Sequence, residues 1–166
     1  LKICSEKGKT IFCTSDDYRE IAITFASGIE SKLNVEKLNL SKLPFRLQKI
    51  SEGIINDSKS TNSASLLYAL RKLNFKKDLI LCGNPNKENY EEFRIKGPRR
   101  VFIYGEHRIE LLNVLKHENI STYSELDEIF EILKKDKHKD ILFSPGNPSG
   151  NDYLNFIERG QHFNNL

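Results

Sequence analysis

From residue 47 onward, short apolar runs alternate with longer segments that carry a helical pattern of apolar residues. This alternation limits the possible folds more than any other feature, because short apolar strands between helices are typical of a parallel sheet covered on both faces. The sequence therefore predicts an α/β fold. The expected strands are Leu47–Ile50, Ile54–Asn56, Leu79–Cys82, Val101–Tyr104 and Ile141–Phe143, with a further short one near Ser121–Tyr123, and the expected helices are Ser63–Leu73, Lys87–Phe93, His107–His117, Ser124–Lys135 and Asp152–Phe163.

The first 42 residues follow a different pattern. Alternating residues around the charged stretch Ser5–Lys9 predict a β-hairpin over residues 1–14, an apolar stripe over Tyr18–Ile29 predicts a helix, and Val35–Leu40 predicts a second, shorter one. Leu43–Arg46 reads as an extended linker, because a proline disfavours the helical conformation at the residue before it. We therefore expect a hairpin-plus-helix remnant over residues 1–42, followed by a Rossmann-like, mostly parallel sheet with helices on both faces over residues 43–166.

Composition excludes several classes of function. A formal net charge of +3 over 166 residues is too mild for a nucleic-acid binder. No apolar run approaches the length of about 18 residues that a membrane span requires, so we expect no membrane partner. The cysteines at positions 4, 13 and 82 form no Cys-x-x-Cys pair, which favours reduced thiols and a cytoplasmic protein.

Two further observations concern cofactors and completeness. The four histidines show no paired spacing typical of metal ligands, so no metal site is predicted. Gly8-Lys9-Thr10 looks like the end of a phosphate-binding loop, but Ile3 stands where the first glycine of that loop is needed. The chain begins at Leu1 and contains no methionine, so we expect it to be a piece of a longer protein.

A polar loop follows one of the predicted buried strands. After Ile54 and Ile55 come seven polar residues, Asn56 to Asn62, and then a helical pattern begins at Ala64. In open α/β sheets, ligands bind beyond the carboxyl ends of the strands, and a helix N-terminus favours anions there. The alternative is ordinary helix capping, for which Thr61, Asn62 or Ser63 are suitable.

A second loop of the same kind follows the last predicted strand. It runs from Ser144 to Tyr153, is rich in glycine, proline and hydroxyl groups, and precedes the final helix. In a parallel sheet both loops would leave the same edge. They could hold a small carboxylate ligand between Lys59, Thr61 and Ser149, although proline and glycine also form ordinary turns.

Four motifs in this order resemble the Mur ligases, and among them the ligase that adds D-glutamate. Leu43-Pro44-Phe45-Arg46 resembles the linker of that family, and the loop from Asn56 to Asn62 resembles its Asn-Asp-Ser-Lys-Ala-Thr-Asn motif. Tyr104-Gly105-Glu106 resembles its Phe-Gly-Glu turn, and the stretch from Ser144 to Gly160 resembles its final signature. The resemblance covers residues 43–166 as the C-terminal, glutamate-binding domain, and residues 1–42 look like the end of the central ATP-binding domain.

The resemblance implies roles for individual residues. Thr61 would bind the α-carboxylate of D-glutamate, and Ser149 with the backbone of Phe156 would bind the side-chain carboxylate. Lys59 would supply positive potential near the reacting group, and Lys87 is a candidate for a carboxylate-binding lysine. The nucleotide would be contacted by residues of the linker and of the first loop, namely Arg46, Asn56 and Asp57.

The resemblance also implies a reaction. ATP and Mg²⁺, held mainly by a central domain that is not in this chain, would convert the alanyl carboxylate of UDP-N-acetylmuramoyl-L-alanine into an acyl-phosphate. The amine of D-glutamate would then attack the acyl carbon, as a step in the synthesis of peptidoglycan precursors. We expect a monomer, and we expect this chain to be inactive by itself.

Three positions depart from the family pattern and keep alternatives open. Phe45 replaces a histidine of the linker, Asn86 stands where the family lysine is expected, and residues 12–16 lack the usual adenine-site motif. One alternative is a ligase of the folylpolyglutamate synthase type, which also binds glutamate. The other is an α/β binding module that has lost its catalytic function.

Overall fold

The computed structural model of the chain describes residues 2–6, 9–13, 21–24, 43–73, 77–87, 93–136 and 140–166. The chain divides into two compact units, Leu1–Lys42 and Leu43–Leu166. In the first unit, β1 (Lys2–Glu6) and β2 (Lys9–Cys13) pair in antiparallel fashion, which confirms the predicted hairpin. Residues 21–24 are helical. The rest of the helix predicted over Tyr18–Ile29, and the one over Val35–Leu40, lie outside the described residues.

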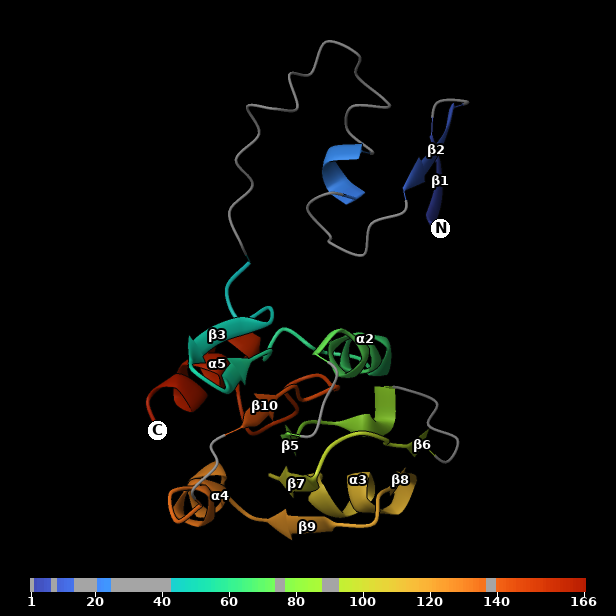
Figure 1. The fold of residues 1–166 in the computed structure, drawn as a ribbon. Helices are drawn as coiled ribbons and strands as arrows, with labels where there is room; N and C mark the ends of the chain where they lie inside the picture. The colour runs from blue at the N-terminus through green and yellow to red at the C-terminus, as the bar shows by residue number, and fades with distance from the viewer. Residues whose placement is uncertain are drawn as a thin grey trace. The chain divides into compact units, whose positions relative to one another are not determined.

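The second unit contains a six-stranded sheet in the order β3-β4-β10-β5-β7-β9 (Figure 1). All neighbouring strands are parallel except β3 and β4, which are antiparallel. This confirms the predicted α/β fold with a mostly parallel sheet. The strands are β3 (Gln48–Ser51), β4 (Ile54–Asn56), β5 (Asp78–Leu81), β7 (Arg100–Tyr104), β9 (Ile120–Tyr123) and β10 (Ile141–Phe143), and a separate parallel pair consists of β6 (Phe93–Arg94) and β8 (Leu115–Lys116).

Helices cover both faces of this sheet (Figure 1). Successive residues of a strand point to opposite faces, so Leu79 and Leu81 of β5 join one buried cluster with α2 (Ser63–Leu73) and α3 (Arg108–Val114). Ile80 joins the other cluster, with α4 (Leu126–Leu133) and α5 (Phe156–Asn164). Both faces of the strand are therefore buried, as the continuous apolar runs predicted. Among the described helices, none has the length and apolar character needed to cross a membrane.

Several predicted boundaries differ from those in the structure. The helix predicted over His107–His117 ends early because Leu115 and Lys116 form β8. The helix predicted from Asp152 begins at Phe156, since Asn155 is its cap. The helix predicted over Lys87–Phe93 overlaps a 3-10 turn, η2 (Pro85–Lys87), at its first residue and β6 at its last. Residues 88–92 lie outside the described residues.

The linker predicted to be extended is a tight turn. The N–H of Arg46 donates to the carbonyl of Leu43 (3.4 Å), and both Phe45 and Leu47 have positive φ angles, of 57° and 46°. Tertiary contacts override the local preference here. Phe45 is buried against Gly160, where an added Cβ would lie 2.5 Å from Cδ1 of the phenylalanine ring.

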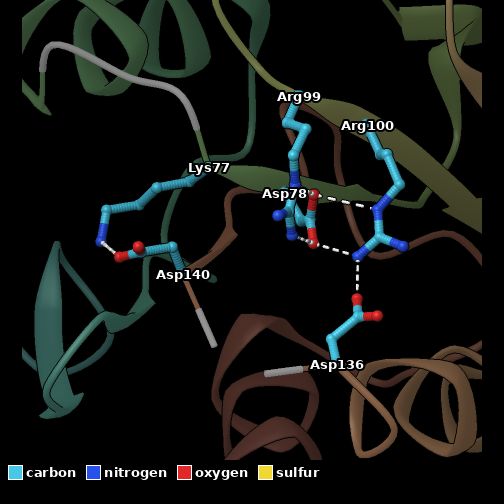
Figure 2. Close-up of polar contacts among 6 residues, drawn as sticks. All are labelled: Lys77, Asp78, Arg99, Arg100, Asp136 and Asp140. Atoms are coloured by element: carbon cyan, nitrogen blue, oxygen red, sulfur yellow. Dashed lines mark hydrogen bonds and ion pairs between the residues drawn. The ribbon is translucent and has the colours of Figure 1, made fainter. Parts of the chain in front are cut away.

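Charged side chains gather at the amino ends of the central strands (Figure 2). Asp78, the first residue of β5, is fully buried and accepts hydrogen bonds from the guanidinium groups of Arg99 and Arg100. Arg100 also pairs with Asp136, which follows α4. Nearby, Lys77 pairs with Asp140 at 2.7 Å. This charged cluster holds together the loops at the edge of the sheet opposite to the one from which the predicted binding loops leave.

Candidate functional site

Three loops meet at the carboxyl edge of the sheet. Residues 57–62 follow β4, residues 144–155 follow β10 and residues 82–84 follow β5, and these strands are parallel neighbours. The structure therefore brings together the two loops singled out in the sequence and adds a third. Backbone hydrogen bonds join them, from Asp57 N–H to the Phe143 carbonyl (2.7 Å), from Gly146 N–H to the Ser60 carbonyl (3.0 Å) and from Asn84 N–H to the Pro148 carbonyl (3.0 Å).

The β4 loop is shaped by its two asparagines. Oδ1 of Asn56 accepts the N–H of Ser58 (3.0 Å), which is the short-range bond of an Asx turn. Oδ1 of Asn62 accepts the N–H of Ser65 (2.8 Å), so Asn62 caps α2 among the three residues considered for that role. Asn56 also donates to the carbonyl of Gly160 (2.9 Å) and to Asn164 (2.7 Å), which fixes the loop to α5.

Asp57 lies at the centre of this loop and is 1% exposed. Its Oδ1 accepts the N–H of Leu47 (3.0 Å) and its Oδ2 accepts the hydroxyl of Ser144 (2.9 Å). Burial raises the pKa of Asp57 to about 6, against the opposing effect of these two donors and of nearby Arg46. Through these two hydrogen bonds the carboxylate joins the turn over residues 43–47, the β4 loop and the β10 loop.

Arg159 of α5 is a buried cation that ties the loops together. It is fully buried, and its guanidinium donates to the hydroxyl and the carbonyl of Ser58 (3.1 and 2.9 Å). It also donates to the carbonyl of Asn147 (3.1 Å) and lies 3.9 Å from the sulfur of Cys82. One side chain thus contacts all three loops, mostly through neutral acceptors.

Ser149 lines a hollow of about 390 Å³ between the β5 and β10 loops. Its walls come from Asn84, Pro148, Gly150, Asn151 and Leu154. Gly83 lets the loops approach this closely, because its φ is +94° and an added Cβ would lie 2.0 Å from the Pro148 carbonyl oxygen. The hollow is therefore an open space at the edge where the sequence predicted a carboxylate ligand.

Lys59 lies next to Phe156, the first residue of α5. Its ammonium nitrogen is 4.0 Å from the centre of the phenylalanine ring. The backbone N–H of Lys59 donates to the carbonyl of Phe45 (2.9 Å). A cation placed over an aromatic face is attracted by the electrons of the ring. The structure therefore holds a positive charge beside the N-terminus of α5, which itself favours anions.

The remaining predicted site residues do not line one common space. Thr61 is half-buried in the β4 loop, but it is not among the residues that line the hollow. Arg46 is half-buried in the turn before β3, and Asn56 and Asp57 are buried with their side chains bonded inside the protein. Lys87 closes η2, three residues after Asn84. The ligand roles of these residues remain predictions.

Sequence reasoning assigned no role to two polar residues of this edge, Arg159 and Ser60. Arg159 appeared only as part of a motif, yet it lies in line with Phe156, Gly160 and Phe163 on the buried stripe of α5. A cation in such a stripe is a usable signal, because it must find acceptors inside the protein. The hydroxyl of Ser60 is also buried and has no hydrogen-bond partner among the described residues.

The structure shows no cluster of metal-ligating side chains among the described residues. No group of three or more His, Cys, Asp or Glu side chains among them could hold a metal ion. Both oxygens of Asp57 accept hydrogen bonds from the protein, and the group is buried. We therefore assign no step of a reaction to a metal bound by these residues.

Comparison with known proteins gives a consistent result. No family model matches the chain. The chain is 33% identical over 133 residues to the UDP-N-acetylmuramoylalanine–D-glutamate ligase of Thermotoga sp. (strain RQ2). It is 35% identical over 156 residues to the ligase of that name from Leptospira interrogans serogroup Icterohaemorrhagiae serovar copenhageni, and 30% identical over 162 residues to the one from Prochlorococcus marinus (strain MIT 9312).

These similarities cover most of this chain but a minor part of the relatives. They extend over 75%, 75% and 88% of the chain, and over 31%, 34% and 35% of the three ligases. The chain thus spans about a third of the length of the curated relatives it matches.

Proposed function

Since the chain is homologous to part of the D-glutamate-adding Mur ligases, we propose that it is the D-glutamate-binding part of such a ligase. The whole protein would join D-glutamate to UDP-N-acetylmuramoyl-L-alanine at the expense of ATP, in the synthesis of peptidoglycan precursors. The observation that carries this proposal is the meeting of the β4 and β10 loops at one edge of the sheet, where Gly146 N–H bonds to the carbonyl of Ser60.

We propose that the two carboxylates of D-glutamate are bound by different loops. Thr61 of the β4 loop binds the α-carboxylate, and Ser149 of the β10 loop, with the backbone of Phe156, binds the side-chain carboxylate. The position of Ser149 on the wall of the hollow supports this assignment. So does Lys59 above the Phe156 ring, because a cation next to a helix N-terminus attracts an anion.

In this proposal the described residues orient the amine rather than activate ATP. ATP and Mg²⁺, bound mainly by other parts of the parent protein, supply the phosphoryl group that activates the alanyl carboxylate. The loops hold D-glutamate so that its amine faces the acyl carbon, and they help to exclude water from it. Fixed orientation of this kind can lower a reaction barrier by several kcal/mol, about 7–11 in the best intramolecular cases.

Nucleotide contacts are proposed first for Arg46, because its side chain is half-exposed. Asp57 is buried and bonded to the N–H of Leu47, so it would reach ribose hydroxyls only after movement of the turn over residues 43–47. Asn56 is buried and would first have to break its hydrogen bonds to Gly160 and Asn164 of α5. Lys87 is proposed as an additional carboxylate ligand because η2 follows Asn84 on the wall of the hollow. We place this function in the cytoplasm, where ATP is available and a thiol such as Cys82 stays reduced.

The proposal is tested by kinetics of the full-length parent protein. ATP-dependent phosphate release is measured with UDP-N-acetylmuramoyl-L-alanine and D-glutamate. In each of the variants Thr61→Ala and Ser149→Ala, the free energy of D-glutamate binding should become less favourable by about 1.5–3 kcal/mol, which is the size of a hydrogen bond to a charged group. The Michaelis constant for D-glutamate should therefore rise roughly ten- to a hundredfold, while that for ATP stays nearly unchanged.

Matched controls come from the edge strand β9, which is remote from the loops. Thr122→Ala and Ser121→Ala remove the same hydroxyl groups there and should leave both Michaelis constants unchanged. Unaltered D-glutamate dependence in both loop variants would reject the site. A folate acceptor in place of the nucleotide acceptor would identify the folylpolyglutamate synthase type of ligase, and absence of turnover with either acceptor would favour a non-catalytic module. Turnover by the 166-residue chain alone would contradict its expected inactivity.

A further inference from the structure

A second hollow lies at the amino ends of β7 and β9, away from the loops proposed to bind D-glutamate. Its volume is about 550 Å³. One wall is the segment between β6 and β7, and the other is the end of β8 with the residues that precede β9. The lining residues of this basic hollow are Arg94, Ile95, Lys96, Gly97, Pro98, Lys116, His117 and Glu118.

The charges around the basic hollow are not balanced. Arg94, Lys96 and Lys116 contribute three cations, Glu118 contributes one carboxylate, and all four residues are exposed. Among the described residues, none of these three cations has an ion-pair partner. The arginines of the charged cluster in Figure 2 behave differently, since Arg99 and Arg100 are both paired with Asp78.

The backbone holds two of the cations side by side. Arg94 of β6 is the register partner of Lys116 of β8, and like charges in such neighbouring positions repel each other. Beyond β6, the N–H of Ile95 donates to the carbonyl of Lys116 (3.1 Å), which keeps the two segments together next to Lys96. A bound anion would relieve this repulsion, because it would lie between the cations.

The floor of the hollow is fixed. Nε2 of His117 donates to the carbonyl of Pro98 (3.1 Å), and Nδ1 lies 3.0 Å from the backbone nitrogen of Asn119, so the ring joins the two walls. Ile95 and Pro98, which also line the hollow, are buried. The concave shape therefore does not depend on the long, exposed side chains at its rim.

From this geometry we propose that the basic hollow binds a small, multiply charged phosphate, either inorganic or carried by an organic molecule. Its volume falls in the range of about 300–1,000 Å³ that is typical of small-molecule sites. Arginine and lysine are the side chains that proteins use most for phosphate oxygens. A concave site with a fixed floor suits a compact anion better than an extended acidic segment of another protein.

Titration of the 166-residue chain with inorganic pyrophosphate, followed by calorimetry, tests this proposal. The double variant Arg94→Gln/Lys116→Gln should bind pyrophosphate roughly a hundredfold more weakly, since it removes two cations and each charged hydrogen bond contributes about tenfold. Lys135→Gln, which removes an exposed lysine after α4, is the matched control and should bind like the parent chain. Absence of pyrophosphate binding, or equal binding by the double variant, would overturn the proposal.

Melting temperatures test pyrophosphate binding independently of the calorimetry. The double variant by itself should melt at the same or a higher temperature, because it removes the repulsion between residues 94 and 116. Pyrophosphate should raise the melting temperature of the parent chain and of Lys135→Gln, but not that of the double variant. Stabilisation by a polyglutamate peptide without any by pyrophosphate would instead indicate an acidic protein partner and reject the small anion.

Discussion

Two buried aspartates, at opposite edges of the same sheet, behave in opposite ways. Asp57 follows β4 at the carboxyl edge and accepts hydrogen bonds from the Leu47 N–H and the Ser144 hydroxyl, both neutral donors. Asp78 begins β5 at the amino edge and accepts bonds from two guanidinium groups (Figure 2). Burial raises the pKa of Asp57 to about 6. Burial also acts on Asp78, but the hydrogen bonds from Arg100 and Arg99 outweigh it and hold the pKa of Asp78 below its ordinary value.

The difference teaches that burial alone does not decide the state of a carboxyl group. The charged partners of Asp78 stabilise its ionised form, so this residue acts as a structural clamp. The neutral donors to Asp57 orient its carboxyl group, but they compensate for lost hydration less than the guanidinium groups at Asp78 do. The amino edge therefore carries a carboxyl group whose ionised form is stabilised, and the carboxyl edge carries one whose charge remains sensitive to its surroundings.

The largest expected effect comes from Asp78→Asn, which leaves Arg99 and Arg100 without their shared carboxylate. Breaking a buried ion pair typically costs 3–5 kcal/mol. Arg99 and Arg100 are 43% and 22% exposed and can turn towards water, so we expect the lower end, about 3 kcal/mol. Urea unfolding at pH 7 measures this loss. A loss below about 1 kcal/mol, the usual value of an exposed pair, would show that Asp78 is not a clamp.

The pH dependence of stability in the same variant tests the direction of the pKa shift of Asp78. A folded-state pKa below the ordinary value of 3.8 means that Asp78 contributes stability above pH 3.8, which is lost as the pH falls through the folded-state pKa. The Asp78→Asn chain lacks this contribution, so its stability should fall less steeply than that of the parent chain below pH 3.8.

Asp57→Asn should have a smaller effect of the opposite sign. The folded-state pKa of about 6 exceeds the ordinary value of 3.8, so the folded state binds the proton more tightly. Stability therefore declines as the pH rises from 3.8 to about 6, by roughly 1–3 kcal/mol. Asparagine keeps an acceptor for the Leu47 N–H and carries no charge. We expect the variant to be more stable at pH 7, without the decline between pH 4 and 6.

Unfolding curves at several pH values between 3.5 and 7.5 test this expectation, with the parent chain beside the variant. A less stable Asp57→Asn chain at pH 7 would mean that the ionised carboxylate is favoured in the folded protein. The contrast between the two edges would then be lost.

The smallest expected effect comes from Asp140→Asn, at the border of the charged cluster. Asp140 is 56% exposed and Lys77 is 20% exposed, so water and salt screen this pair. Lys77 also keeps a hydrogen bond to the carbonyl of Gly53 (3.0 Å) in the variant. The loss of stability should stay below about 1 kcal/mol and should vanish at high salt. A loss equal to that of Asp78→Asn would show that solvent exposure does not determine how much these ion pairs contribute to stability.

Much of the fold could be predicted because local signals and tertiary structure agree. The predicted bounds of α2, β4 and β10 match the structure residue by residue. In α2 a capping residue, Asn62, precedes a regular apolar stripe, and β4 and β10 are apolar runs that end in polar loops. The strands β6 and β8 are two residues long, which is too short for any periodic pattern to appear.

Other features could not be predicted because distant residues decide them. The turn at Phe45 and Leu47 exists because Gly160 leaves room for a ring and Asp57 accepts the Leu47 N–H, and both partners lie elsewhere in the sequence. The start of α5 was misplaced because two capping residues compete. Asp152 accepts the N–H of Glu106 (2.9 Å), so the cap falls to Asn155.

The meeting of the two predicted loops followed from topology, since parallel neighbours send their loops to one edge. The predicted loops do meet there, and Ser149 does line a hollow. The role of Arg159 did not follow, because its place in the apolar stripe of α5 indicates burial but does not reveal which loops supply its acceptors. Those acceptors, on Ser58 and Asn147, become apparent only once the helix has been placed against the sheet.

One consequence of Arg159 concerns how this edge can move. A single guanidinium bonds to residues that follow β4 and β10 and lies against Cys82 at the end of β5. None of these segments can shift by itself without breaking bonds to the others, so any rearrangement must be concerted. Amide hydrogens of the three segments should consequently exchange with solvent deuterium through a common opening event, and ligand binding should slow them all together.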